Sequence, residues 1–259
     1  MLSPTEVQSL AADIFAQHER RETFKPIPDR IPTVADAQDI QDAYVDLLLK
    51  KYRTTVGGYK VALTSKRVRD WLKVYEPCAG QVLASRIYQS PHTERVSDYV
   101  RFSAETEVCA VLDRDMGGPC TVADVRTNLR SLHCAYELVE DRGADMNKMD
   151  ARSLASDNSW NAGIVIGPPG PTDIDFNNRT GTLKVNGVAT QHGTTAETMG
   201  GDPLEAVVWL AAYLGKRGKA ILAGQPVMTG TIVQSQFLKA GDRLEFAMDG
   251  MPPVFLNLI

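Results

Sequence analysis

The stretch VRFSAETEVCAVLDRDM, residues 100–116, decides how the rest of the chain is interpreted. Its β-branched, aromatic and small apolar residues predict a long strand. Because residues two apart in a strand point to the same face, Glu105 and Glu107 would project together. Two negative charges on a partly buried face repel each other, and a divalent cation between them reverses the sign of that interaction. An exposed edge strand that carries two glutamates is the alternative explanation.

Outward from this strand, the chain reads as a helical N-terminus followed by a strand-rich body. Two capped amphipathic patterns precede Gly57, one beginning at Ser3 and one running from Thr33 to about Tyr52. The later patterns predict helices over 121–133 and 202–218, a hairpin over 179–190, and strands over 57–65, 134–141, 219–230, 242–250 and 253–259. The predicted fold class is therefore α+β, with a helical subdomain over residues 1–56 and a strand-rich catalytic domain over 57–259.

Composition narrows the class of protein. The 259 residues are 43% hydrophobic and 23% charged, and the net charge of −4 argues against a nucleic-acid partner. The sequence contains no apolar run long enough for a membrane span, and its first residues lack the pattern of a signal peptide. The four cysteines form no CxxC pair, which favours free thiols in the cytoplasm over a zinc site.

A third carboxylate strengthens the metal hypothesis. Glu137 lies in the predicted strand CAYELVED, residues 134–141. If the two strands are neighbours, three carboxylates would give Mg²⁺ or Mn²⁺ three oxygen ligands and leave positions open for a substrate. Spacing does not establish that the strands are adjacent, and a solvated glutamate is the alternative.

Two further segments carry candidate site residues. Lys60 lies in the predicted strand GGYKVALTS, residues 57–65, where it is either an acid or base beside a cation or a surface lysine with a buried stem. The segment ASDNSWNAGIVIG, residues 155–167, gathers Asp157, Asn158, Ser159 and Asn161 before an apolar run. These polar residues either orient a ligand or form a turn.

Several motifs, in order, resemble one family: 2-keto-4-pentenoate hydratase and 4-oxalocrotonate decarboxylase, within the fumarylacetoacetate hydrolase superfamily. GGYKVALTSK resembles its lysine-bearing strand, AETEVCAVLDRDM its E-x-E strand, and YELVEDR the segment that carries its third ligand. SDNSWNAGIVIG is similar to its D-N-x-S-x-G-G stretch, GDPLEAVVWLAAYL to its tryptophan-bearing helix, and VMTG to its L-T-G strand.

The resemblance implies a mixed β-roll or sandwich with an N-terminal helical subdomain, usually as a homo-oligomer. It implies that Glu105, Glu107 and Glu137 bind Mg²⁺ or Mn²⁺ and that Lys60 is catalytic. Asp157, Asn158, Ser159 and Asn161 would then line the substrate pocket or support its lining.

The implied activity is hydration of a 2-hydroxydienoate or 2-oxo-enoate from aromatic ring cleavage, so the predicted enzyme is a lyase. Decarboxylation of a 4-oxalocrotonate-type acid is an alternative, because loss of CO₂ generates the same dienolate and needs nearly the same site. Many members of the family have E-P-D-x-G where this chain has Cys78 in place of the acid, a change in the pocket that leaves the reaction type open. Hydrolysis of acylpyruvates is a second alternative, although adjacent His18 and Glu19 would point about 100° apart on a helix. A non-enzymatic metal- or sugar-binding module is the third.

Overall fold

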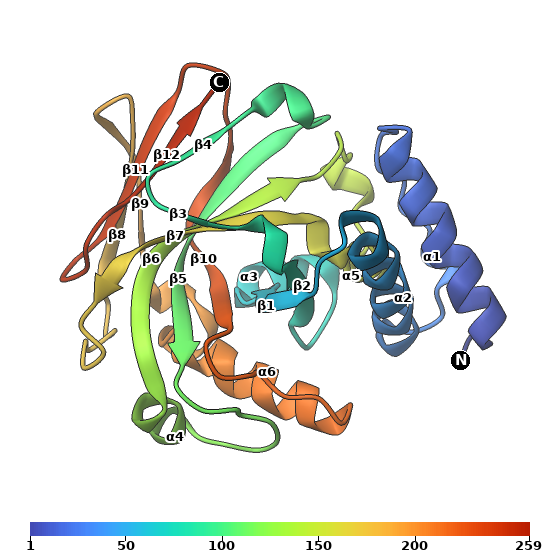
Figure 1. Cartoon of the computed structure of the whole chain (residues 1–259), viewed down its shortest axis with the longest axis horizontal. Helices are drawn as coiled ribbons and strands as arrows, with labels where there is room; N and C mark the ends of the chain where they lie inside the picture. Colours follow the sequence, from blue (N-terminus) through green and yellow to red (C-terminus); the bar gives the residue numbers. More distant parts are fainter.

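The computed structural model describes the backbone of residues 1–259 and every side chain except those of residues 234–237. Two helices at the N-terminus, α1 (Pro4–Glu19) and α2 (Val34–Tyr52), pack against each other at one side of the molecule (Figure 1). Ser3 caps α1 in a capping box with Glu6, and Thr33 caps α2. Their shared apolar face includes Leu10, Ile14 and Ile40, so the sequence periodicity identified both helices.

The strands form two curled sheets on the other side of the molecule (Figure 1). Within the described structure, the larger sheet has the order β2-β1-β10-β5-β6-β7-β3 and the smaller one the order β4-β12-β11-β8-β9. The strand bounds are β1 (Val56–Ala62), β2 (Cys78–Leu83), β3 (Ile87–Gln89), β4 (His92–Glu94), β5 (Phe102–Leu112), β6 (Leu129–Glu140), β7 (Asn161–Gly170), β8 (Thr180–Val185), β9 (Val188–Thr194), β10 (Pro226–Phe237), β11 (Arg243–Met248) and β12 (Val254–Leu258).

The main core lies between these sheets and extends under one long helix. Tyr136 of β6 meets Phe246 of β11 at a ring separation of 6.4 Å, and α6 (Leu204–Lys216) adds buried residues such as Leu210. Shorter helices connect the strands: α3 (Lys66–Leu72), α4 (Val122–Thr127) and α5 (Ala151–Ser156), with the 3₁₀ turns η4 (Met146–Lys148) and η5 (Asn158–Trp160) near the site. This arrangement agrees with the predicted α+β class.

Two predicted elements are wrong in their extent. The helix expected over 121–133 ends at Thr127, because the capping box of Thr121 and Asp124 supports only α4, and the residues from Leu129 onward pair with β5. The strand expected over 219–230 begins only at Pro226. The hairpin around Asn186 and Gly187 is confirmed, with both residues at positive φ as a two-residue turn requires.

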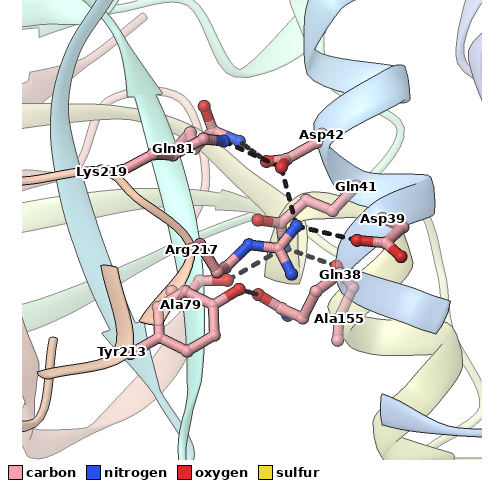
Figure 2. Close-up of polar contacts among 10 residues, drawn as sticks. All are labelled: Gln38, Asp39, Gln41, Asp42, Ala79, Gln81, Ala155, Tyr213, Arg217 and Lys219. Atoms are coloured by element: carbon pink, nitrogen blue, oxygen red, sulfur yellow. Dashed lines mark hydrogen bonds and ion pairs between the residues drawn. The ribbon is translucent and has the colours of Figure 1, made fainter. Parts of the chain in front are cut away.

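A network of polar side chains joins the N-terminal helices to the body (Figure 2). Arg217, just after α6, contacts Asp39 and Asp42 of α2 at 2.8 and 2.9 Å, and Lys219 contacts Asp42 at 2.8 Å. Gln81 of β2 donates to the other oxygen of Asp42 at 2.7 Å. We call these side chains the α2–α6 network. The boundary at residues 56 and 57 between two domains stays a prediction.

Within the described chain, every helix is too short or too polar to cross a membrane.

Candidate metal centre and its cavity

Strand pairing brings the three predicted carboxylates together. In the antiparallel pair of β5 and β6, Glu105 lies opposite Glu137, and Glu107 lies two residues further along β5 on the same face. One carboxylate oxygen from each of the three residues lies within 4.8 Å of the other two. The adjacency that spacing did not establish is therefore present, while metal binding itself stays a prediction.

Each carboxylate is oriented by one neutral donor. The backbone N–H of Gly230 donates to Glu107 Oε2 at 2.7 Å, and the Thr231 hydroxyl donates to Glu105 Oε2 at 2.6 Å. Asn161 Nδ2 donates to Glu137 Oε1 at 2.9 Å. The other oxygen of Glu137, Oε2, is buried and has no hydrogen-bond partner within the described residues. These three donors orient the carboxylates and carry no positive charge.

Burial and mutual repulsion hold the carboxylates in an unfavourable state. Glu107 and Glu137 are each 1% exposed. Burial and then the charges of Glu137 and Glu105 raise the pKa of Glu107 well above its ordinary value. Burial raises the pKa of Glu137 to about 7, although Lys60 partly opposes the shift. Such raised pKa values mark carboxylates that lack a sufficient counter-charge.

A divalent cation fits this arrangement. Hard cations such as Mg²⁺ and Mn²⁺ take carboxylate oxygens, and three of them with further positions free is a common donor set. The unpartnered Glu137 Oε2 gives independent support, because a buried oxygen without a donor is costly and a cation would satisfy it. The residues present therefore fit the predicted metal.

Lys60 lies beside this carboxylate group. It extends from β1, is 4% exposed, and its Nζ lies 3.2 Å from both Glu137 Oε1 and the carbonyl oxygen of Ser159. Burial lowers the pKa of Lys60, but attraction to Glu137, Glu105 and Glu107 outweighs burial and leaves the pKa above its ordinary value. The opposite residue, Gly80, gives the side chain room, since a Cβ there would lie 2.8 Å from Lys60 Cδ.

Cys78 occupies the place of the acid in the resembled motif and lies close to the lysine. Its Sγ is 3.3 Å from the Ser159 hydroxyl, and burial raises the pKa of the thiol despite that hydrogen bond and the charge of Lys60. A protonated thiol carries no charge, so Cys78 supplies none of the negative charge that an aspartate would bring.

The predicted segment from Asp157 to Asn161 divides into two halves. Ser159 and Asn161 reach the lysine and the carboxylates, as described. Asp157 accepts from His18 Nε2 at 2.6 Å and from Arg142 Nη2, and Asn158 bonds to both backbone groups of Gln81 at 2.8 Å. Within the described residues, Asp157 and Asn158 are absent from the lining of the cavity below, and their contacts hold the loop in place.

The backbone of this loop is strained. Asn158, Ser159 and Trp160 have φ values of 50°, 48° and 60°. Asparagine tolerates this left-handed conformation, but it is unfavourable for Ser159 and Trp160 and persists only where surrounding contacts support it. The strain turns the carbonyl of Ser159 toward Lys60, which the sequence pattern did not predict.

A cavity of about 180 Å³ opens beside Lys60, Glu105 and Glu107. Gly230, Thr231 and Ser159 line the same end. The remaining lining is mostly apolar and comes from α3, α5, β6 and the loops around them. We call this part the apolar wall, and it consists of Leu63, Val68, Trp71, Leu72, Val139, Met146, Met149, Leu154 and Trp160.

Two residues matter that sequence reasoning did not single out. Gly230 and Thr231 orient Glu107 and Glu105. Gly230 is the last residue of the quoted VMTG stretch, and Thr231 follows it directly. His18 lies outside the lining and is engaged with Asp157, while the adjacent Glu19 pairs with Lys51. The His18 and Glu19 pair is therefore not placed to activate water for an acylpyruvate hydrolase.

Comparison with known proteins gives consistent matches. The family model for the fumarylacetoacetate (FAA) hydrolase C-terminal domain matches residues 84–255. The chain is 30% identical to a 2-keto-4-pentenoate hydratase of Burkholderia vietnamiensis over 261 residues, 98% of each chain. It is 28% identical to a 2-hydroxyhexa-2,4-dienoate hydratase of Comamonas testosteroni over 239 residues, 88% of each chain.

Solved structures of one enzyme cover the whole chain. It is a 4-oxalocrotonate decarboxylase from Pseudomonas putida G7, and its structure complexed with magnesium and adipate matches with a TM-score of 0.90. The two sequences are 24% identical, and the match covers 100% of this chain and 99% of the other. At this identity the likeness shows a shared fold.

Proposed function

Because the chain belongs to the fumarylacetoacetate hydrolase family, we propose that it is a divalent-metal-dependent hydratase that adds water to 2-hydroxydienoates. The predicted resemblance is confirmed, and kinship with named hydratases confirms the predicted enzyme class, a lyase. The observation that carries the proposal is the group of three carboxylates beside the buried Lys60 at the end of a cavity.

In this proposal Glu105, Glu107 and Glu137 hold the metal, either Mg²⁺ or Mn²⁺. Support comes from the donor set and from the unpartnered Glu137 Oε2. A bound cation supplies a Lewis acid for a substrate whose carboxylate and C2 oxygen can chelate it. Gly230 and Thr231 keep two of the carboxylates in the required orientation.

Lys60 has the role of the proton carrier. Hydration requires that the proton of the C2 hydroxyl leaves and that C5 gains one, which yields a 2-oxo-3-enoate; water then adds at C4 and a proton at C3. The Lys60 ammonium is held by Glu137 and Ser159 at the end of the cavity where the C2 oxygen would lie. A positioned ammonium can donate a proton and take it back in such a tautomerisation.

The strained loop supports this role by positioning. Ser159 accepts from Lys60, Asn161 orients Glu137, and Asp157 with Asn158 anchors the segment between them. Apolar side chains line most of the remainder of the cavity and would contact the hydrocarbon part of the substrate. The catalytic and substrate-binding roles of these residues are proposals that await experiment.

We also infer a cytoplasmic homo-oligomer. The four cysteines are all free thiols in the structure, which favours a reducing compartment. The oligomer rests on the family resemblance.

Mass analysis of products tests the activity. The enzyme is incubated with 2-hydroxypenta-2,4-dienoate and with 4-oxalocrotonate, in Mg²⁺ and in a chelator. A hydratase adds the mass of one water to the first substrate only when metal is present. Loss of the mass of carbon dioxide from the second, without hydration of the first, would instead support the decarboxylase alternative.

A lysine variant tests the site against a non-enzymatic module. Lys60→Met should reduce hydration strongly while Mg²⁺ still raises the melting temperature, because the carboxylates remain. The control is Lys50→Met, which removes an exposed lysine of α2 and should behave as the wild type. Full activity in Lys60→Met would contradict the proposed role.

A further inference from the structure

The cavity has two chemically different ends. Among its described lining residues, the charged ones are Lys60, Glu105 and Glu107, and they lie together at the metal end. The apolar wall forms most of the rest, with side chains from α3, η4, β6 and α5 among them. A substrate held by its C1 carboxylate at the metal end would therefore direct its other end toward the apolar wall.

The Lys60 ammonium, the cation among the described lining residues, already has partners. Lys60 Nζ contacts Glu137 and Ser159, so it balances charge within the carboxylate group. The other polar side chains of the described lining, Thr64, Ser65, Ser159 and Thr231, are neutral hydroxyls. The buried indole Nε1 of Trp160 has no hydrogen-bond partner in the described structure, but a neutral donor does not balance a full negative charge.

Arg69 is a partly buried cation of α3, whereas Lys66 and Arg67 are exposed. Its Nη1 donates to the carbonyl oxygens of Leu63 at 2.8 Å and Thr64 at 2.6 Å. These contacts hold the guanidinium on the backbone that leads into α3, and Arg69 is absent from the described lining. Among the described residues, Lys60 is the only lysine or arginine of the lining, so the apolar wall itself contains no cation.

We propose that this enzyme selects 2-hydroxydienoates whose remote end is uncharged, a hydrogen or a short alkyl group, over dicarboxylates of the same length. The inference rests on the proposed function and narrows its substrate class. Burial of a carboxylate without a partner is unfavourable, whereas methyl and methylene groups gain free energy on leaving water. The apolar wall thus favours the monoacid, because its side chains attract the tail and offer a remote carboxylate no charged partner.

A binding experiment with unreactive analogues tests this selection without relying on turnover. Pyruvate reports on the metal end alone, and 2-oxohexanoate and 2-oxoadipate differ only in a terminal methyl or carboxylate. Titration calorimetry of the Mg²⁺-loaded protein should show 2-oxohexanoate binding at least about tenfold more tightly than pyruvate. 2-Oxohexanoate should also bind about a hundredfold more tightly than 2-oxoadipate.

The possible failures are distinguishable. If pyruvate does not bind in a metal-dependent way, the proposed function fails and this inference fails with it. If pyruvate binds but 2-oxoadipate binds as tightly as 2-oxohexanoate or more tightly, the inference alone is overturned. Turnover then gives a second comparison: kcat/KM for 2-hydroxyhexa-2,4-dienoate should exceed that for the matching six-carbon diacid by about a hundredfold. Comparable turnover of the diacid would overturn the inference.

A cation placed in the wall should change the preference. Val68→Arg on α3 should improve 2-oxoadipate relative to 2-oxohexanoate by about tenfold or more, because a guanidinium can pair with the remote carboxylate. Val68→Met is the matched control of similar reach without charge, and Met149→Arg with Met149→Leu repeats the test from another segment. Arg69→Met should leave the preference unchanged. A fall in 2-oxoadipate binding in that variant, from a wild type that prefers it, would identify Arg69 as the missing partner and overturn the inference.

Discussion

The carboxylates of the α2–α6 network and those of the metal centre are the same chemical groups under opposite conditions. In the network, Asp39 and Asp42 face Arg217 and Lys219, and the side chains of the two aspartates are 55% and 32% exposed (Figure 2). In the metal centre, three glutamates share one ammonium, and two of them are almost fully buried.

The difference separates charges that serve the fold from charges that serve a ligand. Exposed ion pairs contribute only ~0–1 kcal/mol each to stability, since water screens them and already solvates their partners. Buried like charges cost stability, and a protein keeps them only where another group offsets the cost. The network joins α2 to the body, whereas the proposed cation would offset the charge of the three glutamates.

Removal of one carboxylate from the metal centre should have the largest effect. We expect Glu107→Gln to lower Mg²⁺-dependent turnover by about a thousandfold or more, equivalent to ~4 kcal/mol of transition-state stabilisation. The melting temperature of the metal-free protein should rise, because one repelling charge is gone. Steady-state kinetics and thermal melts with and without Mg²⁺ measure both effects.

The matched control for that change is Glu197→Gln, at an exposed glutamate outside the site. It should leave turnover and both melting temperatures close to those of the wild type. A Glu107→Gln protein that retains full Mg²⁺-dependent activity would remove the basis of the metal assignment.

A buried pair that holds the loop should give the next largest effect. Asp157→Asn leaves Arg142, 1% exposed, without its anionic partner, which should cost about 3–5 kcal/mol in the free energy of unfolding. The loop then positions Ser159 and Asn161 less well, so kcat should fall more than KM rises. Denaturant unfolding and kinetics measure the two.

Asp13→Asn provides the comparison, because Asp13 pairs with Arg30 on the surface with both side chains about half exposed. It should change the free energy of unfolding by less than ~1 kcal/mol. An Asp157→Asn protein with wild-type stability and kcat would show that the loop is held by its other contacts.

The pH dependence of stability should expose the cost of the two buried glutamates, Glu107 and Glu137. Their pKa values in the folded state are raised from the ordinary 4.5, to about 7 for Glu137. Between pH 4.5 and about 7, the metal-free folded state therefore binds more protons than the unfolded state. Stability of the metal-free protein should therefore be greatest below pH 4.5, with respect to these groups, and fall by a few kcal/mol as pH rises toward about 7.

Metal should reverse that trend, because it binds the deprotonated carboxylates. The rise in melting temperature on addition of Mg²⁺ should grow as pH increases over the same window and then level off. Thermal melts at a series of pH values measure it, with Glu107→Gln as the variant in which the growth should be small. A metal-induced rise that is independent of pH would argue that these carboxylates are not the ligands.

The same contrast explains which parts of the site were predictable. The alternation in β5 placed Glu105 and Glu107 on one face, and the strand period is a local property of the sequence. The register that sets Glu137 opposite Glu105 depends on a turn and a short helix, and the helix ended earlier than its pattern suggested. Local periodicity therefore gave the direction of the side chains, and only the folded chain gave their partners.

Other features of the site have no local signal. Ser159 and Trp160 adopt left-handed backbone conformations that neither residue type favours, and contacts of Asp157 with His18 and Arg142 impose them from distant elements. The apolar wall likewise combines segments that are far apart in the sequence, and each of them alone reads as ordinary core. The sequence could thus suggest the metal ligands but not the chemistry of the remote end of the cavity.

The smallest effect should come from the α2–α6 network, and it completes the comparison. Arg217→Met removes the cation that Asp39 and Asp42 share, and Lys219 still faces Asp42. Since the aspartates reach solvent, we expect a loss of only about 1 kcal/mol in the free energy of unfolding and no change in kcat/KM or in the response to Mg²⁺. Denaturant unfolding, kinetics and melts with Mg²⁺ measure the three quantities. If Arg217→Met lowered turnover substantially, the network would be coupled to Lys60 through Gln81 and the adjacent Gly80 of β2, and the division between charges for the fold and charges for the ligand would not hold.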